Sequence, residues 1–369
     1  MHIPFCKQAC TYCNFHFTTS LRYKDEMVEA LISEVKAEKD YLGGEPVNTL
    51  YFGGGTPSLL SLADCAALLE AIQKYYPLAP DAEITLEANP DDIDSVKLQG
   101  WKALGINRLS IGVQSFFEEE LRWMNRAHNA RQALECIEWS HQFGLTNLSI
   151  DLIYGSPLLT DEMWKQNVDR ASSLGITHLS CYALTVEEKT PLQKFIHTKK
   201  TNDVNPDRQA SQFLLLMQWL REKGYEHYEV SNFALPGFRS RHNSSYWKGE
   251  KYLGLGPSAH SFNGAERRWN APNNQAYIAG SKEGLFPREK ELLTAVQQLN
   301  EYIMISLRTK EGLDLSRVEK MGGEPEKQRV VSALQKFSNS GLVHLHQSGA
   351  SLTDEGMLMA DGIASDLFF

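Results

Sequence analysis

Short runs of β-branched and aromatic residues alternate with longer amphipathic runs over the first 224 residues of the chain. The short runs predict strands at residues 47–52, 83–87, 108–113, 148–153 and 178–182. Ahead of the first run, Met27, Leu31 and Val35 recur at helical spacing and predict an amphipathic helix. Similar helices are expected near residues 61–76, 92–104, 130–143, 162–174 and 206–223.

This alternation predicts parallel strands joined by right-handed helical crossovers. A closed barrel needs eight such units. The chain supplies six if residues 1–5 form a first strand. We therefore expect an α/β fold in which residues 1–224 form an open, partial (β/α)6 barrel of TIM-like form.

The alternation stops after residue 224. Residues 225–290, rich in Gly, Asn and aromatic side chains, are expected to form a connecting segment on the substrate side. Helical periodicity returns at 292–307, and a further helix, two short strands and a final helix are expected after residue 328. Residues 291–369 thus predict a smaller α+β C-terminal domain of winged-helix-like form, which either only packs on the barrel or also binds a partner.

Composition and charge favour a globular protein over one that binds nucleic acid or spans a membrane. A hydrophobic content of 42% and a charged content of 22% are typical of a globular chain. The net charge of −9 provides no overall positive field for nucleic acid or for an anionic membrane surface. The longest apolar runs fall well short of the ~20 residues that a membrane-spanning helix needs. We expect a cytoplasmic protein with no transmembrane segment and no nucleic-acid partner.

The clearest candidate for chemistry is a group of three cysteines, Cys6, Cys10 and Cys13, at the spacing C-x3-C-x2-C. No further cysteine follows until Cys65, so this loop suits a cubane iron–sulfur cluster held by three thiolates with one iron left open. Structural zinc is an alternative, but the second pair of ligands is missing. Disulfides are disfavoured for this chain. The remaining cysteines, in apolar contexts, are expected in the core: Cys65, Cys136 and Cys181.

The cysteine spacing, with Tyr12 directly before the last cysteine, resembles the cluster motif of the radical S-adenosylmethionine superfamily. The run His2-Ile3-Pro4-Phe5 narrows the resemblance to the oxygen-independent coproporphyrinogen III oxidase family and its HemW-like heme chaperone branch. The resemblance implies a barrel of the radical SAM type and a 4Fe-4S cluster whose open iron binds S-adenosylmethionine. It also implies reductive cleavage to a 5′-deoxyadenosyl radical with an external electron donor, and a few more residues before His2 than this sequence has.

Glycines and isolated polar residues follow the predicted strands, where the functional groups of a barrel gather. The run Gly53-Gly54-Gly55 lets the backbone approach a ligand, or simply makes a tight turn. Glu87 and Asp151 are carboxylates in apolar runs, which ribose hydroxyls, an ammonium group or a structural ion pair would explain. The resemblance implies these S-adenosylmethionine-binding residues: Tyr12, Gly54, Gly55, Thr56, Glu87, Gln114, Arg126, Asp151 and Ala183.

A second motif lies in the connecting segment. Residues 242–247, His-Asn-Ser-Ser-Tyr-Trp, match the H-N-x-x-Y-W signature of HemW-like heme chaperones. Histidine is a common axial ligand of heme iron, and aromatic rings stack on flat macrocycles. The resemblance therefore implies heme binding by His242, Tyr246 and Trp247, while a loop histidine that caps or hydrogen-bonds is the alternative.

The chain departs from the oxidases of this family in two ways. They carry another cysteine two residues after the third, where this chain has Phe15, and they carry a long N-terminal segment that is absent here. We therefore expect a chaperone that binds cluster, S-adenosylmethionine and heme and delivers heme to acceptor proteins, with peripheral membrane contact left open. The alternatives are an oxygen-independent coproporphyrinogen III oxidase that makes protoporphyrinogen IX, or another tetrapyrrole enzyme, and an interaction protein that never cleaves its nucleotide. No catalytic residue is assigned.

Overall fold

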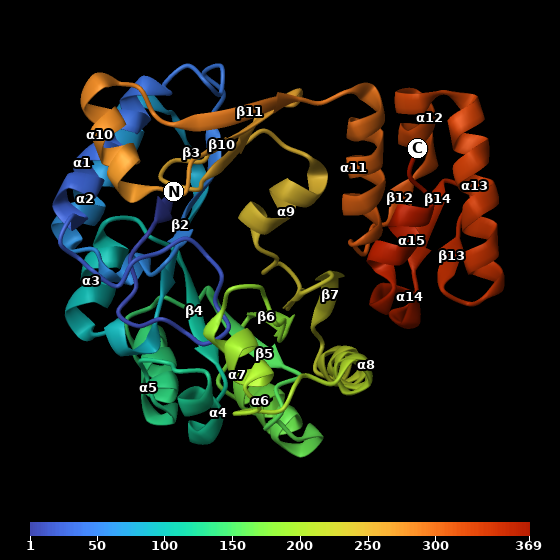
Figure 1. Cartoon of the computed structure of the whole chain (residues 1–369), viewed down its shortest axis with the longest axis horizontal. Coiled ribbons are helices and arrows are strands. Elements are labelled where there is room, and N and C mark those ends of the chain that lie inside the picture. The colour runs from blue at the N-terminus through green and yellow to red at the C-terminus, as the bar shows by residue number, and fades with distance from the viewer.

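The larger part of the molecule is built on an eight-stranded sheet in the order β1-β2-β3-β4-β5-β6-β8-β7. The computed structural model describes residues 1–369 (Figure 1). Strands β1 to β6 pair in parallel, and β8 and β7 continue the sheet in antiparallel fashion. The strands are β1 (His2–Ile3), β2 (Val47–Gly54), β3 (Leu78–Ala88), β4 (Arg108–Gln114), β5 (Leu148–Tyr154), β6 (His178–Ala183), β7 (Glu226–Glu229) and β8 (Asn232–Ala234).

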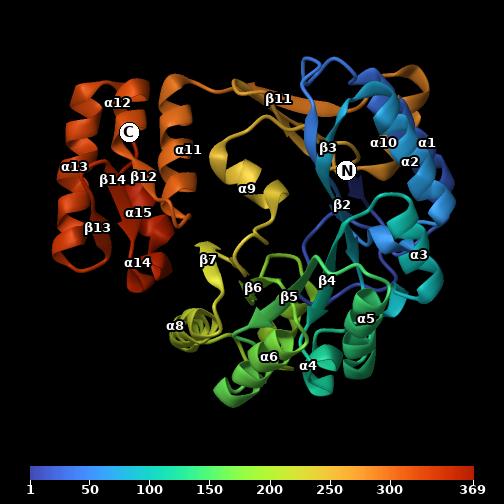
Figure 2. The ribbon, with the colours of Figure 1, turned by 180° about the vertical axis from the view of Figure 1, so that it is seen from behind.

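The crossover helices cover the outer face of this sheet (Figures 1 and 2). Two of them, α2 and α5, begin with capping boxes at Ser61 and Asn129 that satisfy their first backbone amides. Two short helices after β4 and β6, α4 and α7, were not predicted. The helices are α1 (Lys24–Ala37), α2 (Leu62–Tyr75), α3 (Ser95–Ala103), α4 (Glu118–Trp123), α5 (Ala130–Gln142), α6 (Asp161–Ser173), α7 (Pro191–His197) and α8 (Pro206–Glu222).

The predicted partial barrel of six βα units is confirmed. Its first strand contains only two residues, and these pair in parallel with Gly53 and Gly54 of β2. The antiparallel strands β7 and β8 were not predicted. With four and three residues, they are too short to carry a recognisable alternation of apolar and polar positions.

Side chains along the central strands alternate between two environments. Leu86 and Leu109 are fully buried in the main core. The alternate positions face the barrel interior, where Glu87 and Ser110 line a cavity. Arg108, two residues before Ser110 in β4, is only 2% exposed, and its Nε and Nη2 atoms have no hydrogen-bond partner. The interior is therefore polar, unlike the packed apolar interior of a closed TIM barrel.

Residues 235–292 pack against the β1 edge of the sheet and against helix α1. Helix α10 packs against α1, where the buried carboxylate of Glu34 accepts hydrogen bonds from the Tyr277 hydroxyl at 2.5 Å and from Asn270 Nδ2 at 2.7 Å. Edge strand β1 is covered by this segment, because the His2 amide donates to the Leu255 carbonyl. The elements are α9 (Arg241–Lys248), β9 (His260–Phe262), β10 (Glu266–Asn270), α10 (Asn274–Glu283) and β11 (Arg288–Leu292).

The smaller α+β part at the C-terminal end has its own hydrophobic core, as predicted. A three-stranded antiparallel sheet, β12-β14-β13, packs against helices (Figure 1). Backbone bonds attach this part to edge strand β7: the Val230 amide donates to Arg308 and the Lys310 amide to Tyr228. The elements are α11 (Ala295–Leu307), β12 (Leu313–Asp314), α12 (Leu315–Gly322), α13 (Glu324–Asn339), β13 (Val343–Leu345), β14 (Gly349–Leu352), α14 (Asp354–Leu358) and α15 (Ala360–Asp366).

The predicted boundaries at residues 224 and 290 stay predictions. The main core runs from Ile3 to Phe286, so the connecting segment shares it with the barrel. No helix of the protein is long and apolar enough to cross a membrane.

Replacing Glu34 tests how firmly the connecting segment is held. Glu34→Ala leaves the buried donors of Tyr277, Asn270 and the Gly256 amide without their acceptor. We expect a loss of about 3 kcal/mol or more in the free energy of unfolding, measured by urea denaturation. The exposed Glu29 of the same helix is the matched control, and Glu29→Ala should change stability by less than about 0.5 kcal/mol. Equal effects of the two substitutions would contradict the assigned role of Glu34.

Candidate functional site

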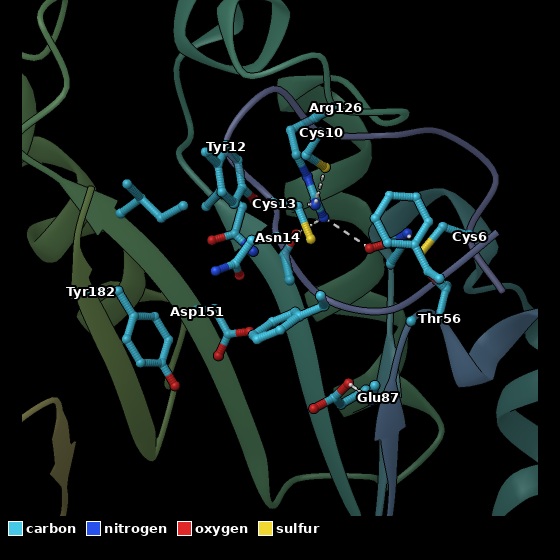
Figure 3. Close-up of a pocket in the computed structure, with 18 of the residues that line it drawn as sticks. Cys6, Cys10, Tyr12, Cys13, Asn14, Thr56, Glu87, Arg126, Asp151 and Tyr182 are labelled. Carbon is cyan, nitrogen blue, oxygen red and sulfur yellow. Dashed lines mark hydrogen bonds between the residues drawn. The ribbon is translucent and has the colours of Figure 1, made fainter. Parts of the chain in front are cut away.

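A cavity of about 730 Å³ lies at the carboxyl ends of the parallel strands. We call it the cysteine cavity, because all three motif cysteines line it together with every residue predicted to bind S-adenosylmethionine. Figure 3 shows the three thiols directed into one space, with the carboxylates of Glu87 and Asp151 below them. The predicted residues that line it are Cys6, Cys10, Cys13, Tyr12, Gly54, Gly55, Thr56, Glu87, Gln114, Arg126, Asp151 and Ala183.

The cysteine loop between β1 and α1 is held by residues far along the chain. The Thr11 amide donates to the Met124 carbonyl at 3.1 Å, and Asn125 Nδ2 donates to the Ala9 carbonyl at 2.7 Å. The start and the end of the loop are also joined, because the Cys6 amide donates to the Thr18 carbonyl at 3.0 Å. The loop is therefore fixed to the barrel by the segment between α4 and α5.

The three thiols are free of disulfides. Burial raises the pKa of Cys6 to about 11 and also raises the pKa of Cys13. Both are therefore protonated thiols at neutral pH, and binding of iron would displace these protons. No three His, Cys, Asp or Glu side chains are grouped to hold a single metal ion. A cubane does not require such grouping, because each sulfur binds a different iron.

Arg126 joins the cysteine loop to the ends of β3 and β4. Its Nη1 donates to Cys10 Sγ at 3.1 Å, and its Nη2 donates to Asn89 Oδ1 at 2.8 Å and to the Gly112 carbonyl at 2.7 Å (Figure 3). No pattern in the sequence indicates the contact between Arg126 and the cysteine sulfur. Asn89, which was also missed as a site residue, follows Glu87 by two positions at the end of the same strand.

The glycines after β2 are required by the packing of the protein itself. A Cβ on Gly55 would lie 2.6 Å from the Phe5 carbonyl oxygen, and one on Gly53 would lie 2.7 Å from the ring of Tyr51. Gly54 has φ of +107°, which side chains strongly disfavour. Contact with β1 and with Phe5 after it thus accounts for Gly54 and Gly55, and the side chains of Tyr51 and Glu87 account for Gly53. Approach to a ligand stays a prediction.

The two carboxylates in the cavity are not in ion pairs. Glu87 Oε1 accepts from the Tyr51 hydroxyl at 2.7 Å and Oε2 accepts from the Gly54 amide at 3.1 Å. Burial raises the pKa of Glu87 to about 7 and that of Asp151 to about 6. Because Asp151 has no ion-pair partner, the alternative of a salt-bridged structural Asp is wrong. Both carboxylates keep acceptor capacity for hydroxyl or ammonium donors of a ligand.

Backbone irregularity places Gln114 in the cavity. The register of β4 and β5 shifts between Ile111 and Gln114, and Gln114 has φ of +65°. Such bulges redirect side chains at the ends of strands. Cavity residues that sequence analysis missed include Asn14, Phe15, Tyr182 and Ser231.

The structure places His242 in a different cavity, of about 560 Å³, which we call the His242 cavity. His242 lies in helix α9 and not in a loop. Its Nδ1 is 2.9 Å from the Thr49 hydroxyl, and its ring stacks on Tyr51 at 4.7 Å between centroids. Burial lowers the pKa of His242 to about 3, so the imidazole is neutral, the form that binds metals.

The other two residues of this motif are less enclosed. The Tyr246 hydroxyl is 3.2 Å from His242 Nε2, and its side chain is 42% exposed. Neither Tyr246 nor Trp247 lines the His242 cavity. The amides of Arg241 and His242 donate to the carboxylate of Glu83, which fixes the start of α9 to β3.

Family models match two parts of the chain. The model described as the radical SAM superfamily matches residues 1–171, and the model described as the HemN C-terminal domain matches residues 293–359. The first match covers the cysteine loop and β1 to β5. The second covers most of the smaller C-terminal part.

The chain is similar to curated proteins over nearly its whole length. It is 32% identical to heme chaperone HemW of Bacillus subtilis over 98% of this chain and 97% of that protein. It is 34% identical to heme chaperone HemW of a Synechocystis species over 92% of this chain and 84% of that protein. Among solved structures, coproporphyrinogen III oxidase HemN of Escherichia coli, described as a radical SAM enzyme, covers 100% of this chain and 88% of its own with a TM-score of 0.85 and 25% identity.

Loss of any cysteine in the loop should prevent assembly of a cluster. After anaerobic reconstitution, we expect Cys6→Ala, Cys10→Ala and Cys13→Ala to lower bound iron and sulfide and the visible absorbance of the cluster to background. Cys65→Ala removes a buried thiol from α2 and should keep full iron content. Zinc in place of iron, or a complete cluster in the Cys10 variant, would contradict the assignment.

The affinity for S-adenosylmethionine should fall as pH is lowered through the pKa of Glu87. With a pKa of about 7, the ionised fraction of Glu87 falls about fourfold between pH 8 and pH 6.5. We expect a similar weakening of nucleotide binding, measured by anaerobic equilibrium dialysis. Glu87→Gln should bind more weakly but show little change over this range, because Asp151 titrates lower. If nucleotide binding by Glu87→Gln depended on pH as strongly as binding by the unsubstituted protein, Glu87 would not be one of the binding residues.

Proposed function

We propose that this chain, which belongs to the HemW family of the radical SAM superfamily, is a heme chaperone that binds a 4Fe-4S cluster, S-adenosylmethionine and heme and passes heme to acceptor proteins. The observation that carries this proposal is the presence of two separate cavities. One gathers the three cysteines, and the other contains a neutral histidine among aromatic side chains.

The donor set of the cysteine cavity fits the cluster and the nucleotide. Cys6, Cys10 and Cys13 would hold three irons, and the carboxylates of Glu87 and Asp151 would accept hydrogen bonds from the nucleotide. Together, the cluster and S-adenosylmethionine supply one-electron cleavage of a carbon–sulfur bond when an external donor reduces them. The protein residues position the nucleotide and exclude water.

The size and lining of the His242 cavity support the binding of an aromatic macrocycle. Its volume lies within the range of about 300–1,000 Å³ that is usual for ligand sites. Tyr51, Tyr76 and Tyr252 line it together with aliphatic side chains. Lys251 at the same cavity, now 2.7 Å from Glu45, offers a cation for a propionate.

Coproporphyrinogen III oxidase remains the second candidate because the HemN fold matches the whole chain. The residue that stands where those oxidases carry a further cysteine is Phe15, which lines the cysteine cavity and is 70% exposed. A phenylalanine cannot replace a thiol in ligation or redox chemistry. This difference favours the chaperone.

A heme acceptor, an external electron donor and a cytoplasmic location belong to the same proposal. Peripheral contact with a membrane is compatible with delivery of heme there. The net charge of −9 gives no support to a nucleic-acid partner.

Heme titration of the anaerobically reconstituted protein tests the proposal. His242→Ala removes the axial ligand, and we expect heme affinity to fall at least about tenfold, with loss of the Soret band of the ligated heme. The exposed His344 of the C-terminal part is the matched control, and His344→Ala should bind heme like the unsubstituted protein.

A parallel oxidase assay separates the two candidates. With dithionite, S-adenosylmethionine and coproporphyrinogen III, we expect no protoporphyrinogen IX. Formation of that product at an enzymatic rate would favour the oxidase. Heme affinity that is unchanged in His242→Ala would contradict the proposed heme site.

A further inference from the structure

One residue from the lining of each cavity takes part in a direct contact between the two linings. Glu87 lines the cysteine cavity and Tyr51 lines the His242 cavity. The Tyr51 hydroxyl donates a 2.7 Å hydrogen bond to Glu87 Oε1. A single hydrogen bond thus joins the lining of one cavity to the lining of the other.

The backbone of β2 makes room for this contact. Gly53 lies beside the pair, and a Cβ there would be 2.7 Å from the Tyr51 ring and 2.9 Å from Glu87 Oε1. Gly54 supplies its amide to Glu87 Oε2 at 3.1 Å. Glycine at position 53 therefore leaves room for Tyr51 and Glu87 to meet.

In the His242 cavity, Tyr51 sets the plane of the His242 imidazole. The two rings are stacked at 4.7 Å with 18° between their planes, and Thr49 holds Nδ1 at 2.9 Å. The other ring nitrogen, Nε2, lies 3.2 Å from the hydroxyl of the exposed Tyr246. A metal bond to Nε2 lies in the ring plane, so groups that fix this plane control metal affinity.

We propose that nucleotide in the cysteine cavity raises the affinity of the His242 cavity for heme, and that the hydrogen bond from Tyr51 to Glu87 carries this coupling. Donors on the nucleotide stabilise the ionised carboxylate of Glu87, and an ionised acceptor holds the Tyr51 hydroxyl more strongly than a neutral one does. When the position of Tyr51 is fixed, the stacked imidazole of His242 keeps the orientation in which it can bind iron. Coupling of this kind is reciprocal, so heme raises nucleotide affinity by the same factor.

This inference rests on the proposed function, since it requires both ligands to bind. Heme titrations of the cluster-loaded protein are run with and without S-adenosylmethionine, and the cluster is kept oxidised so that the nucleotide stays intact. We expect saturating nucleotide to tighten heme binding at least about fivefold. We also expect the reverse titration, nucleotide with and without heme, to give the same factor.

Tyr51→Phe removes the hydroxyl and keeps the ring, so its heme affinity and heme absorption spectrum should no longer respond to nucleotide. Gly53→Ala, which crowds the same contact, should weaken the response in the same way. Tyr252 lines the His242 cavity but makes no hydrogen bond to Glu87, and Tyr252→Phe should keep the fivefold ratio. The ratio within each variant is the readout, so a general change in affinity does not imitate the effect.

Two outcomes separate the failure of the coupling from the failure of the function. The coupling is wrong if both ligands bind but neither changes the affinity for the other, or if Tyr51→Phe keeps the ratio of heme affinities with and without nucleotide. Neither result contradicts the proposed chaperone function. If heme shows no saturable binding that depends on His242, the proposed function falls, and the coupling falls with it.

Discussion

Parallel pairing of the first six strands is the constraint on which the rest of the structure depends. Strands that run in one direction end at one edge of the sheet, so the loops that follow them meet there. The cysteine loop follows β1, the glycines end β2, Glu87 ends β3, and Ala183 ends β6. Cys6 and Ala183, which are 177 positions apart, therefore line one cavity without any long-range motif in the sequence.

The sequence was sufficient for those features that depend on periodicity or on position along a strand. Six strands and their long crossover helices follow from alternation, whereas most of the predicted lining of the cysteine cavity was implied by the family resemblance. The contact of Arg126 with Cys10 and the stacking of Tyr51 on His242 follow from neither, because they join residues 116 and 191 positions apart through tertiary packing. The division of the predicted residues between two cavities was missed for the same reason, since a local motif does not indicate which end of β2 it will lie against.

The barrel interior holds ionisable groups at a cost in stability. Burial disfavours the charged forms of Glu87 and Asp151, and Arg108 has two nitrogen atoms without hydrogen-bond partners. Such groups are retained where a ligand relieves the cost. A ligand that binds only the folded state also stabilises it, so the same interior that weakens the empty barrel makes it responsive to occupancy.

The backbone bonds between β7 and the C-terminal part have a consequence for solubility. An open sheet has two edges, and an uncovered edge is a template for pairing with another chain. Here Arg308 and Lys310 bond to the β7 edge, and Leu255 bonds to β1 at the opposite edge. The small C-terminal part therefore also covers the β7 edge and blocks its pairing with another chain. A barrel fragment without it would expose a free strand and tend to self-associate, even with its cavities intact.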